Sequence, residues 1–497
     1  MPTPRLFRLA CLALLASFVL TACGPAASTS TSAPDSTLRP AQGGAPGLLT
    51  GTPAEPSTST PTPAPQIEVA PEALRGIHIQ VWHAFSGAAA DVFTNQLAQF
   101  NTLNQWGIVV YQTAYGDYSS LFEDVDSALT STRRPDLVVA LPEQTFTWEA
   151  KGAVVDLNPY LYDPAWGLTA NEIADIPATF WTQDPVNGQR LGAPAQRSAR
   201  FLFYNQTWAR ELGFSAPPAT ADEFRQQACA ANAYYRQDAN KQNDGYGGWI
   251  VNTQPEAMLS WLLAFGGGVV MVGQSPTIKD GEIHFATPAN QSALEFLKGL
   301  YDEHCAWIST EPNPYESFAR RSALFVTGDL AEAPRLTQTL ARLNNSDEWT
   351  LLPFPGLNGA VLVTSGPSYT LLQSTPEKQF AAQHSLAAQH SLAAWLFVRW
   401  LLSAENQAKW VEATGLLPLR FSALDSLGEY RAGHPQWNNA VGYIPEAQAS
   451  PQLAAWRMAQ YVLADGAGFI FRTNLAVEKI PSVLDEMDAT VEEISNK

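Results

Sequence analysis

The amino-acid sequence predicts an α/β protein whose folded part divides into two lobes. Strand-like and helix-like segments alternate between residues 77 and 141 at the lengths of a βαβαβ unit, which has a parallel sheet. The chain from about residue 73 to Lys497 is also too long for one hydrophobic core. Residues 188–214 change from a polar, Arg-rich segment to an apolar run, as a strand passing between lobes would. An ordinary edge strand fits that local pattern equally well.

The amino terminus predicts a secreted lipoprotein. A basic start precedes the apolar run 9–20, which is too short for a membrane-spanning helix of roughly 20 residues and is typical of a signal peptide. Leu20-Thr-Ala-Cys23 resembles a bacterial lipobox, so we expect removal of residues 1–22 and lipidation of Cys23. Two or three acyl chains would anchor the protein stably. The alternative is an ordinary signal peptide with a chance cysteine.

Residues 24–72 consist almost entirely of Ser, Thr, Pro, Ala and Gly. Such a segment cannot bury enough apolar surface to offset the entropy lost on ordering, so we expect an extended tether over residues 23–72. No later apolar run is long enough to span a bilayer.

Composition narrows the possible partners. The net charge of −18 at pH 7 argues against nucleic acid, whose binding needs clustered Lys and Arg. The chain also has 15 Trp and 15 Tyr. We expect most of them to fill the core; the alternative is that several line a site for sugars or other flat-faced ligands.

Two cysteines remain once Cys11 leaves with the signal peptide and Cys23 takes lipid. Outside the cytoplasm such cysteines usually pair, so we predict a disulfide between Cys229 and Cys305; two unpaired buried thiols are the alternative. His304 beside Cys305 does not indicate a catalytic pair, because sequence adjacency is a poor guide to a dyad.

The predicted βαβαβ unit has strands at 77–81, 107–113 and 137–141. Ligands of parallel sheets bind beyond the carboxyl ends of the strands. The loops there contribute the candidate ligand-binding residues Trp82, His83, Ser86, Tyr115, Asp117 and Glu143. No Gly-x-Gly-x-x-Gly opens the first helix, so a dinucleotide is not expected. No second His or Cys stands at metal-ligand spacing from His83.

Two later segments have simpler interpretations. Thr220 and Glu223 form a capping box that opens a helix toward Tyr235. Residues 238–245 resemble a calcium loop only superficially, because they lack the glycine at the sixth place and the glutamate at the twelfth, and we interpret them as a turn.

Several short motifs follow one another in an order typical of one family. They are Tyr204-Asn205, Glu211-Leu-Gly213, Pro217-Pro218, Asp244-Gly-Tyr-Gly247, Leu263-Ala-Phe-Gly-Gly267, Phe325-Val-Thr-Gly328, Leu352-Pro-Phe-Pro355 and Gly415-Leu-Leu-Pro-Leu-Arg420. With the lipobox and tether, they make the chain similar, from about residue 76 onward, to the bacterial extracellular solute-binding proteins of family 1. That family includes the maltose-binding and glycerol-phosphate-binding proteins.

The resemblance implies a type II periplasmic-binding-protein fold, in which crossing strands join two α/β lobes around a ligand cleft. The crossings would lie at Ala195–Arg200, near Val363–Gly366 and after Arg420. The first lobe would then comprise residues 73–195 plus 363–425, and the second lobe residues 196–362 plus 426–497.

Positions that contact ligand in the family carry over to several residues here. The resemblance implies contacts from Trp82, His83, Tyr115, Asp117, Gln196, Arg197, Trp249, Phe265, Gly267 and Trp349. The alternative for each of them is scaffold packing.

One segment departs from the family pattern. Residues 381–392 repeat Ala-Ala-Gln-His-Ser-Leu twice inside a helix predicted from about Pro376 to Ser403. Six residues turn a helix by about 600°, so the two copies face different sides. We interpret the repeat as a tandem insertion or a sequence artefact, and a metal site from His384 and His390 is disfavoured.

The predicted function is that of a lipid-anchored, extracytoplasmic solute-binding component of an ABC importer. It would be monomeric and non-enzymatic, would need no cofactor, and would deliver a captured carbohydrate to permease subunits. Arg197 and Arg200 leave room for an acidic solute. The rival is a secreted glycan-degrading hydrolase, which needs two carboxylates across a cleft, and Asp117 with Glu143 is the pair available. A structural envelope lipoprotein would not need two lobes.

Overall fold

The computed structural model describes residues 67–270, 282–311, 313–357, 359–373, 384–472 and 475–495. The predicted signal peptide, Cys23 and nearly all of the tether lie outside these residues, as do residues 374–383 at the start of the helix predicted from Pro376. No helix among the described residues is long and apolar enough to cross a membrane.

The first sheet has five strands in the order β2-β1-β3-β15-β6. Their bounds are β1 His78–His83, β2 Val109–Ala114, β3 Leu137–Ala140, β15 Ser368–Leu371 and β6 Ala193–Pro194. Strand β1 pairs in parallel with β2 and β3, which confirms the βαβαβ prediction. Strand β1 extends further than predicted, because Trp82 and His83 still pair with Thr113 and Ala114 of β2 rather than lying in a loop.

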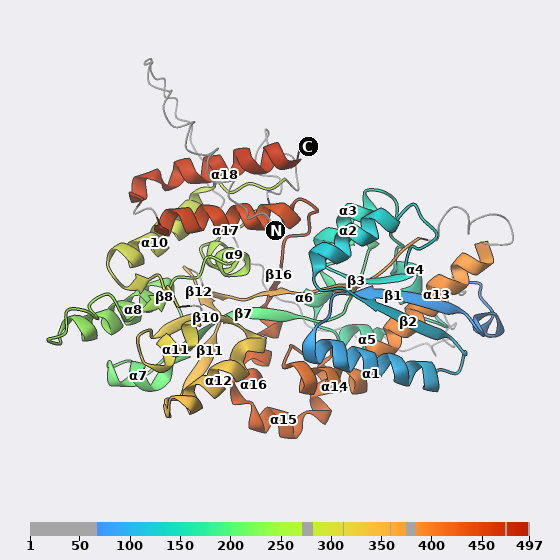
Figure 1. Cartoon of the computed structure of the whole chain (residues 1–497), viewed down its shortest axis with the longest axis horizontal. Helices are drawn as coiled ribbons and strands as arrows, with labels where there is room; N and C mark the ends of the chain where they lie inside the picture. The colour runs from blue at the N-terminus through green and yellow to red at the C-terminus, as the bar shows by residue number, and fades with distance from the viewer. Residues whose placement is uncertain are drawn as a thin grey trace, which may run out of the picture. The chain divides into compact units, whose positions relative to one another are not determined.

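Helices cover both faces of this sheet (Figure 1). Helices α1 (Gly87–Leu103), α13 (His384–Leu401) and α14 (Ala404–Thr414) cover one face; α2 (Tyr118–Ala128) and α3 (Pro142–Glu149) cover the other. All four residues of β3 are therefore buried, Leu137 and Val139 on the first face and Val138 and Ala140 on the second. This explains why β3 is a continuous apolar run in the sequence.

The second sheet has seven strands, with β7 at its centre. Their bounds are β7 Ser198–Asn205, β8 Trp249–Ile250, β9 Ala306–Trp307, β10 Phe325–Asp329, β11 Trp349–Leu352, β14 Val363–Ser365 and β16 Gln448–Ala449. Strands β10, β11 and β14 all pair with β7 in antiparallel orientation. Phe201 and Phe203 of β7 pack on one face, and Leu202 and Tyr204 pack on the other.

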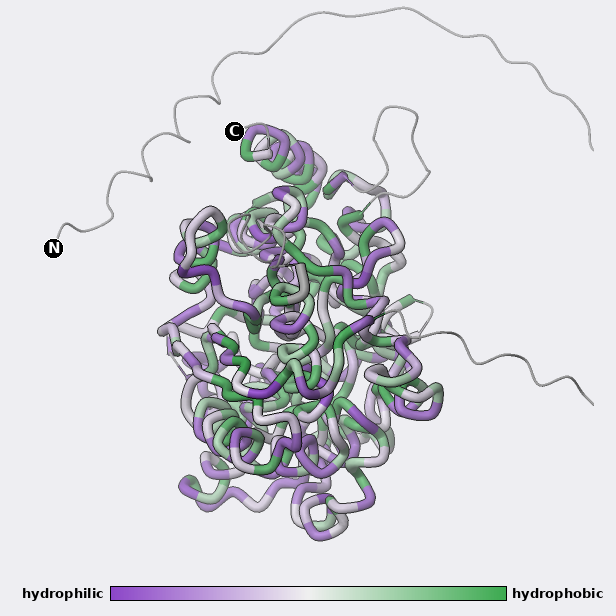
Figure 2. The backbone as a smooth tube through the Cα atoms, turned by 90° about the vertical axis from the view of Figure 1, so that its right-hand side faces the viewer, coloured by the Kyte–Doolittle hydropathy of each residue, from purple (hydrophilic) through white to green (hydrophobic). Residues whose placement is uncertain are grey.

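Helices also cover both faces of the second sheet. One face carries α8 (Ala221–Arg236), α9 (Pro255–Ala264), α10 (Pro288–Asp302), α17 (Trp456–Arg472) and α18 (Ile480–Ser495). The other carries α11 (Pro314–Ala319), α12 (Ala333–Arg342) and α16 (Pro435–Gly442). Figure 2 shows hydrophobic and hydrophilic residues alternating along the carboxyl-terminal helix, as expected of a helix with one buried side.

The chain passes between the two sheets where β6 leads into β7 and where β14 leads into β15. The two connecting segments touch: the Ala195 backbone N–H donates to the Pro367 carbonyl at 3.0 Å. Gly366 is required there, because it has φ +153° and an added Cβ would lie 2.2 Å from the Gln196 carbonyl oxygen.

A buried ion pair lies at these crossings. The Arg197 and Asp184 side chains are 0% and 1% exposed, with Nη2 and Oδ2 3.5 Å apart. The guanidinium also donates to the Pro367 carbonyl at 2.7 Å and to Ser368 Oγ at 3.1 Å. Burial lowers the pKa of Arg197 to about 10, partly offset by the Asp184 carboxylate. Arg197 therefore joins the two crossing segments.

The predicted disulfide is present, because Cys229 of α8 is bonded to Cys305, directly before β9. The predicted capping box is also confirmed: the Glu223 backbone N–H donates to Thr220 Oγ1 at 3.3 Å, and Glu223 Oε2 accepts from the Thr220 N–H at the same distance. Helix α8 is thereby capped at its amino end, and the disulfide joins the middle of the helix to the residue before β9.

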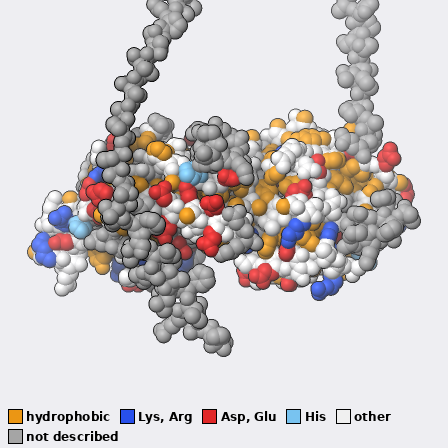
Figure 3. Space-filling model, turned by 90° about the horizontal axis from the view of Figure 1, so that it is seen from above, with side chains coloured by type: hydrophobic (Ala, Val, Ile, Leu, Met, Phe, Trp, Pro, Cys, Tyr) orange, Lys and Arg blue, Asp and Glu red, His pale blue; other side chains and the backbone are white. Residues whose placement is uncertain are grey.

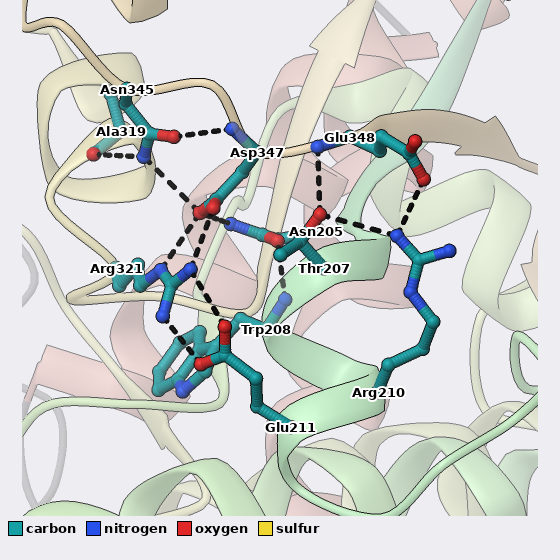
Figure 4. Close-up of polar contacts among 10 residues, drawn as sticks. All are labelled: Asn205, Thr207, Trp208, Arg210, Glu211, Ala319, Arg321, Asn345, Asp347 and Glu348. Atoms are coloured by element: carbon teal, nitrogen blue, oxygen red, sulfur yellow. Dashed lines mark hydrogen bonds and ion pairs between the residues drawn. The ribbon is translucent and has the colours of Figure 1, made fainter.

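A polar network anchors the far end of β7 (Figure 4). Arg321 donates to both Asp347 oxygens, at 2.6 and 2.8 Å, and to Glu211 Oε2 at 2.6 Å. Asn205 caps α7 (Gln206–Glu211) by accepting from the Trp208 N–H, and it donates to Asp347 at 2.8 Å. The Tyr204-Asn205 and Glu211 motifs therefore stabilise the scaffold.

The second copy of the hexapeptide repeat belongs to the folded first lobe. His390 Nδ1 lies 2.9 Å from Asp136 Oδ1, and Leu392 is fully buried. Leu386, its equivalent in the first copy, is 38% exposed. The two copies thus have different environments, as the helical rotation between them predicts.

Candidate functional site

A cavity of ≈ 110 Å³, lined by both polar and apolar side chains, lies where the two lobes and the crossing segments meet. The first lobe contributes Leu141, Pro142, Glu143 and Gln183, and the second contributes Glu256, Trp456 and Gln460. The crossing segment after β14 contributes Ser365 and Gly366, and the segment between β16 and α17 contributes Ser450 and Pro451. A larger cavity of ≈ 240 Å³ lies between α12 and α16, but its described lining residues include no Asp, Glu, Lys or Arg. We therefore take the first cavity as the candidate site.

Glu143 reaches the cavity because of how β3 ends. Pro142 occupies the first turn of α3, so the helix starts directly after the strand and Glu143 lies at its amino end. Gln144 fixes this start: its Oε1 accepts from the Leu141 N–H at 3.1 Å, and its Nε2 donates to the Tyr118 carbonyl at 2.7 Å.

The opposite wall is formed by α9 and α17. Trp456 is the first residue of α17 and Gln460 lies one turn later, so both face the same side. Between them, the Arg457 guanidinium lies 4.6 Å from the ring centroid of Phe122 of α2. Phe122 is stacked in turn on Trp148 of α3, with centroids 5.6 Å apart. Helix α17 is therefore in direct contact with the helical layer of the first lobe.

Carboxylates dominate the electrostatics of the cavity. Burial, the largest cause, and the nearby Glu256 carboxylate raise the pKa of Glu143 to about 7, while a hydrogen bond with Gln460 and the charge of Arg457 lower it. Glu256 in turn lies 3.5 Å from Arg200 of β7. Burial and the neighbouring carboxylate therefore favour the protonated form of Glu143 more than water would.

Gln183 supplies an unused hydrogen-bond acceptor. Its Nε2 donates to the Thr364 carbonyl at 2.7 Å, whereas its buried Oε1 has no hydrogen-bond partner among the described residues. Gln196 Oε1, at the neighbouring crossing, is in the same situation. Such buried acceptors are costly unless a ligand or water satisfies them.

Of the residues predicted from sequence, Glu143 lines the cavity. Trp82 and Tyr115 are half-buried with ring centroids 5.4 Å apart, and they adjoin the apolar cluster that also borders Phe122. Asp117 is exposed and caps α2, where its Oδ1 accepts from the Ser120 N–H at 2.8 Å. Ser86 is exposed at the start of α1.

His83 is enclosed in the first lobe. It is 1% exposed and lies beside the rings of Phe85 and Phe93. Its Nδ1 accepts from the Phe85 N–H at 3.2 Å, so Nε2 carries the proton that bonds Gln112 Oε1 at 3.1 Å. Burial lowers the pKa of His83, so this histidine is a neutral scaffold residue.

Five further predicted residues do not line the cavity. Trp249 is fully buried, and its Nε1 donates to Thr327 Oγ1 at 3.1 Å. Phe265, Trp349 and Arg197 are also buried, the first two in apolar clusters and the third in its ion pair. Gly267 packs against Asn290, whose Oδ1 would lie 2.1 Å from an added Cβ. None of these five residues lines the candidate cavity in this structure.

The residues that sequence reasoning missed come mainly from the second lobe and the crossings: Gln183, Glu256, Ser450, Trp456 and Gln460. One signal in the sequence could have located Trp456. Ser450-Pro451 is a turn-favouring pair, and it stands shortly before the helical pattern that begins at Trp456.

The fold and cavity together define a class of protein: two α/β lobes, joined by crossing strands, with a small cavity of mixed polarity between them. The chain belongs to the family of bacterial extracellular solute-binding proteins, whose model matches residues 95–446. The family consists of binding proteins that act outside the cytoplasm. The protein is accordingly a binding protein and not an enzyme, and nothing supports the predicted hydrolase alternative.

Known proteins of similar sequence and structure are also binding proteins by name. The sn-glycerol-3-phosphate-binding periplasmic protein UgpB of Salmonella typhimurium is 22% identical over 371 residues, which cover 71% of this chain and 77% of UgpB. The sugar-binding protein MalE of Xanthomonas citri has a TM-score of 0.66 at 20% identity, covering 84% of this chain and 97% of MalE. The cyclic alpha-maltosyl-1,6-maltose binding protein of Arthrobacter globiformis also has a TM-score of 0.66, at 16% identity, over 84% of this chain and 98% of its own. These likenesses confirm the predicted type II fold.

Proposed function

We propose that this protein captures a carbohydrate between its two lobes and delivers it to the permease subunits of an ABC importer. The lobes would comprise residues 73–195 plus 363–425 and 196–362 plus 426–497. Capture would proceed by closure: a solute that contacts both walls favours the closed state in proportion to its extra affinity for that state.

The observation that carries this proposal is the composition of the cavity at which the two lobes and the crossing segments meet. It offers the indole of Trp456 beside the carboxyl and amide groups of Glu143, Gln183, Glu256 and Gln460. An aromatic face suits the C–H face of a sugar ring, and carboxylates and amides suit its hydroxyls.

The cavity size supports a closing mechanism. Ligand pockets usually measure about 300–1,000 Å³, whereas this cavity measures ≈ 110 Å³. An oligosaccharide therefore requires the lobes to separate before it enters. Gly366 and the paired crossing segments are the natural place for that rotation, because they are the points at which the chain passes between the sheets.

The charges favour a neutral solute over a phosphorylated one. Arg197 is enclosed by Asp184, and Arg200 lies beside Glu256, so neither offers a free cation to a phosphate. The Glu256 carboxylate would repel an anion in the cavity. The acidic surface is consistent with this preference: red carboxylate side chains are spread over the face in Figure 3, and blue basic side chains occupy only a few places.

Calorimetry with maltotriose, tagatose and sn-glycerol 3-phosphate tests this function. Replacing Trp456 with alanine should weaken carbohydrate binding roughly 30-fold, corresponding to about 2 kcal/mol for an aromatic contact at the centre of a site. Tyr461→Ala is the matched control, because Tyr461 lies on the same helix and is 58% exposed. Unchanged affinity in Trp456→Ala would overturn the site, and binding of the phosphate alone would overturn the solute class.

Anchoring through a lipid on Cys23 is part of the proposal, as is a monomeric state. The lipobox-like Leu20-Thr-Ala-Cys23 and the Ser/Thr/Pro-rich residues 24–72 support it. Cys23→Ser should move the protein from the membrane fraction to the soluble fraction. Equal retention of the variant in membranes would contradict lipid anchoring.

A further inference from the structure

Two carboxyl groups from opposite walls share the candidate cavity. Glu143 lies at the start of α3 in the first lobe, and Glu256 lies in the first turn of α9 in the second. The Glu143 residue is 8% exposed, whereas the Glu256 side chain is 34% exposed. The more enclosed carboxyl group therefore belongs to the first lobe, and it is covered by residues of the second.

The groups that face Glu143 come from three elements, α17, α9 and α2. Helix α17 provides a hydrogen bond from Gln460 and the charge of Arg457, and α9 provides the Glu256 carboxylate. Glu256 is itself 3.5 Å from Arg200 of β7. From α2, Tyr118 presents a phenol whose buried oxygen has no partner among the described residues, and Glu143 contributes to raising the pKa of that phenol.

The electrostatic surroundings of Glu143 thus depend on lobe closure. Glu256, Arg457, Gln460 and the covering Trp456 all lie on the second lobe, so separation of the lobes removes them together. Water would then reach the Glu143 carboxyl, which would behave as an ordinary solvated carboxylate.

Building on the proposed function, we propose that Glu143 binds the solute as a neutral acid, so that closing the lobes over a carbohydrate takes up a proton. The protonated carboxyl would donate a hydrogen bond to a ring, glycosidic or hydroxyl oxygen. Glu256, beside Arg200, would accept hydrogen bonds from hydroxyls. The two acidic residues therefore have opposite roles in recognition.

The sign of the pH dependence follows from the two states of Glu143. Burial and Glu256 raise the pKa of its carboxyl to about 7 in this structure, which we take as the closed state, against an ordinary value of 4.5. Below the ordinary value, both states hold the proton and affinity is constant. Between the two values only the closed state holds it, so affinity falls about tenfold per pH unit as the pH rises. Above the higher value both states are ionised and affinity is constant again.

The test uses the mature full-length chain and titrates maltotriose by calorimetry from pH 5 to 8.5. Wild type should bind about tenfold more weakly per pH unit between pH 5 and 7. At pH 6, in two buffers of different ionisation enthalpy, binding should take up nearly one proton. Glu143→Gln keeps a neutral donor, so its affinity should be independent of pH and should exceed that of wild type at pH 8.

Two further variants sharpen the result. Glu256→Gln removes a charge that raises the pKa of Glu143, so the pH-dependent region should move to lower pH. Glu123→Gln, an exposed acid on α2, should behave as wild type. A pH-independent wild type, or a Glu143→Gln variant with the wild-type pH profile, would overturn the protonation inference while leaving carbohydrate capture intact. If maltotriose and tagatose failed to bind at any pH, both proposals would be overturned.

Discussion

Replacing Arg197 with alanine removes the cation of an ion pair that is fully buried at the crossing between the lobes. Asp184 would remain with its side chain 1% exposed and without its counter-charge. The Pro367 carbonyl and Ser368 Oγ would each lose a hydrogen bond to the guanidinium. Breaking one side of a buried pair typically costs about 3–5 kcal/mol, so we expect the free energy of unfolding to fall by about 4 kcal/mol, roughly a thousandfold in the equilibrium constant.

The loss should depend on pH. Burial already raises the pKa of Asp184, and the Arg197 charge opposes that shift. In Arg197→Ala the opposing charge is gone, so the folded-state pKa rises further above its unfolded value. A carboxyl with a raised folded-state pKa contributes stability at low pH that is lost as the pH rises. The variant should therefore be closer to wild type at pH 5 than at pH 8.

Urea unfolding followed by tryptophan fluorescence at both pH values measures this effect. The double variant Arg197→Leu with Asp184→Leu removes both charges and should recover much of the stability, because buried pairs are often replaceable by apolar residues. A ligand-binding role for Arg197 predicts the opposite pattern: wild-type stability with lost solute affinity. That pattern would refute the assignment of Arg197 to the scaffold.

Two other predictions concern the scaffold. Replacing Cys229 and Cys305 with serine opens a loop with a sequence separation of 76, which should lower the free energy of unfolding by about 4 kcal/mol in the chain-entropy model; a melting temperature equal to that of the oxidised wild type would contradict it. Gly366→Ala should destabilise the crossing far more than Gly428→Ala, because an added Cβ meets the Gln196 carbonyl at 2.2 Å in the first case and nothing within 4 Å in the second. Limited proteolysis of the two variants provides the comparison, and equal cleavage rates would argue against a tight crossing at Gly366.

Much of the secondary structure was predictable because strands and helix starts are signalled by residues that are close together in the sequence. The apolar run Leu137–Leu141 indicated a strand, and the Thr220/Glu223 box marked the start of α8. Glu143 was predicted for the same reason, since it directly follows a strand whose direction the βαβ pattern determines. The end of β1 was placed too early, because continued pairing with β2 is a tertiary contact that the apolar pattern does not record.

The prediction was weakest for side chains whose direction depends on packing. Trp249 stands at a plausible position along the chain, yet in β8 its ring points into the core against Phe224 and Trp261. Arg197 looked available to a ligand because its partner Asp184 lies in a different segment. Pairing with neighbouring strands determines the register, and the register determines the face on which each side chain lies. The position of a residue in the sequence therefore does not reveal that face.

The sequence by itself thus determined the signals that depend on composition and on neighbouring residues: the lipobox-like start, the α/β alternation, the family resemblance and the pairing of the two remaining cysteines. Only the tertiary structure decided which groups share the cavity. Glu143 and Gln460 are more than 300 residues apart in the chain, and they meet because α17 contacts the helical layer of the first lobe through Arg457 and Phe122. At that contact, burial, the Glu256 carboxylate and the Arg457 guanidinium together determine the pKa of Glu143. The residues next to Glu143 in the sequence indicate none of these influences.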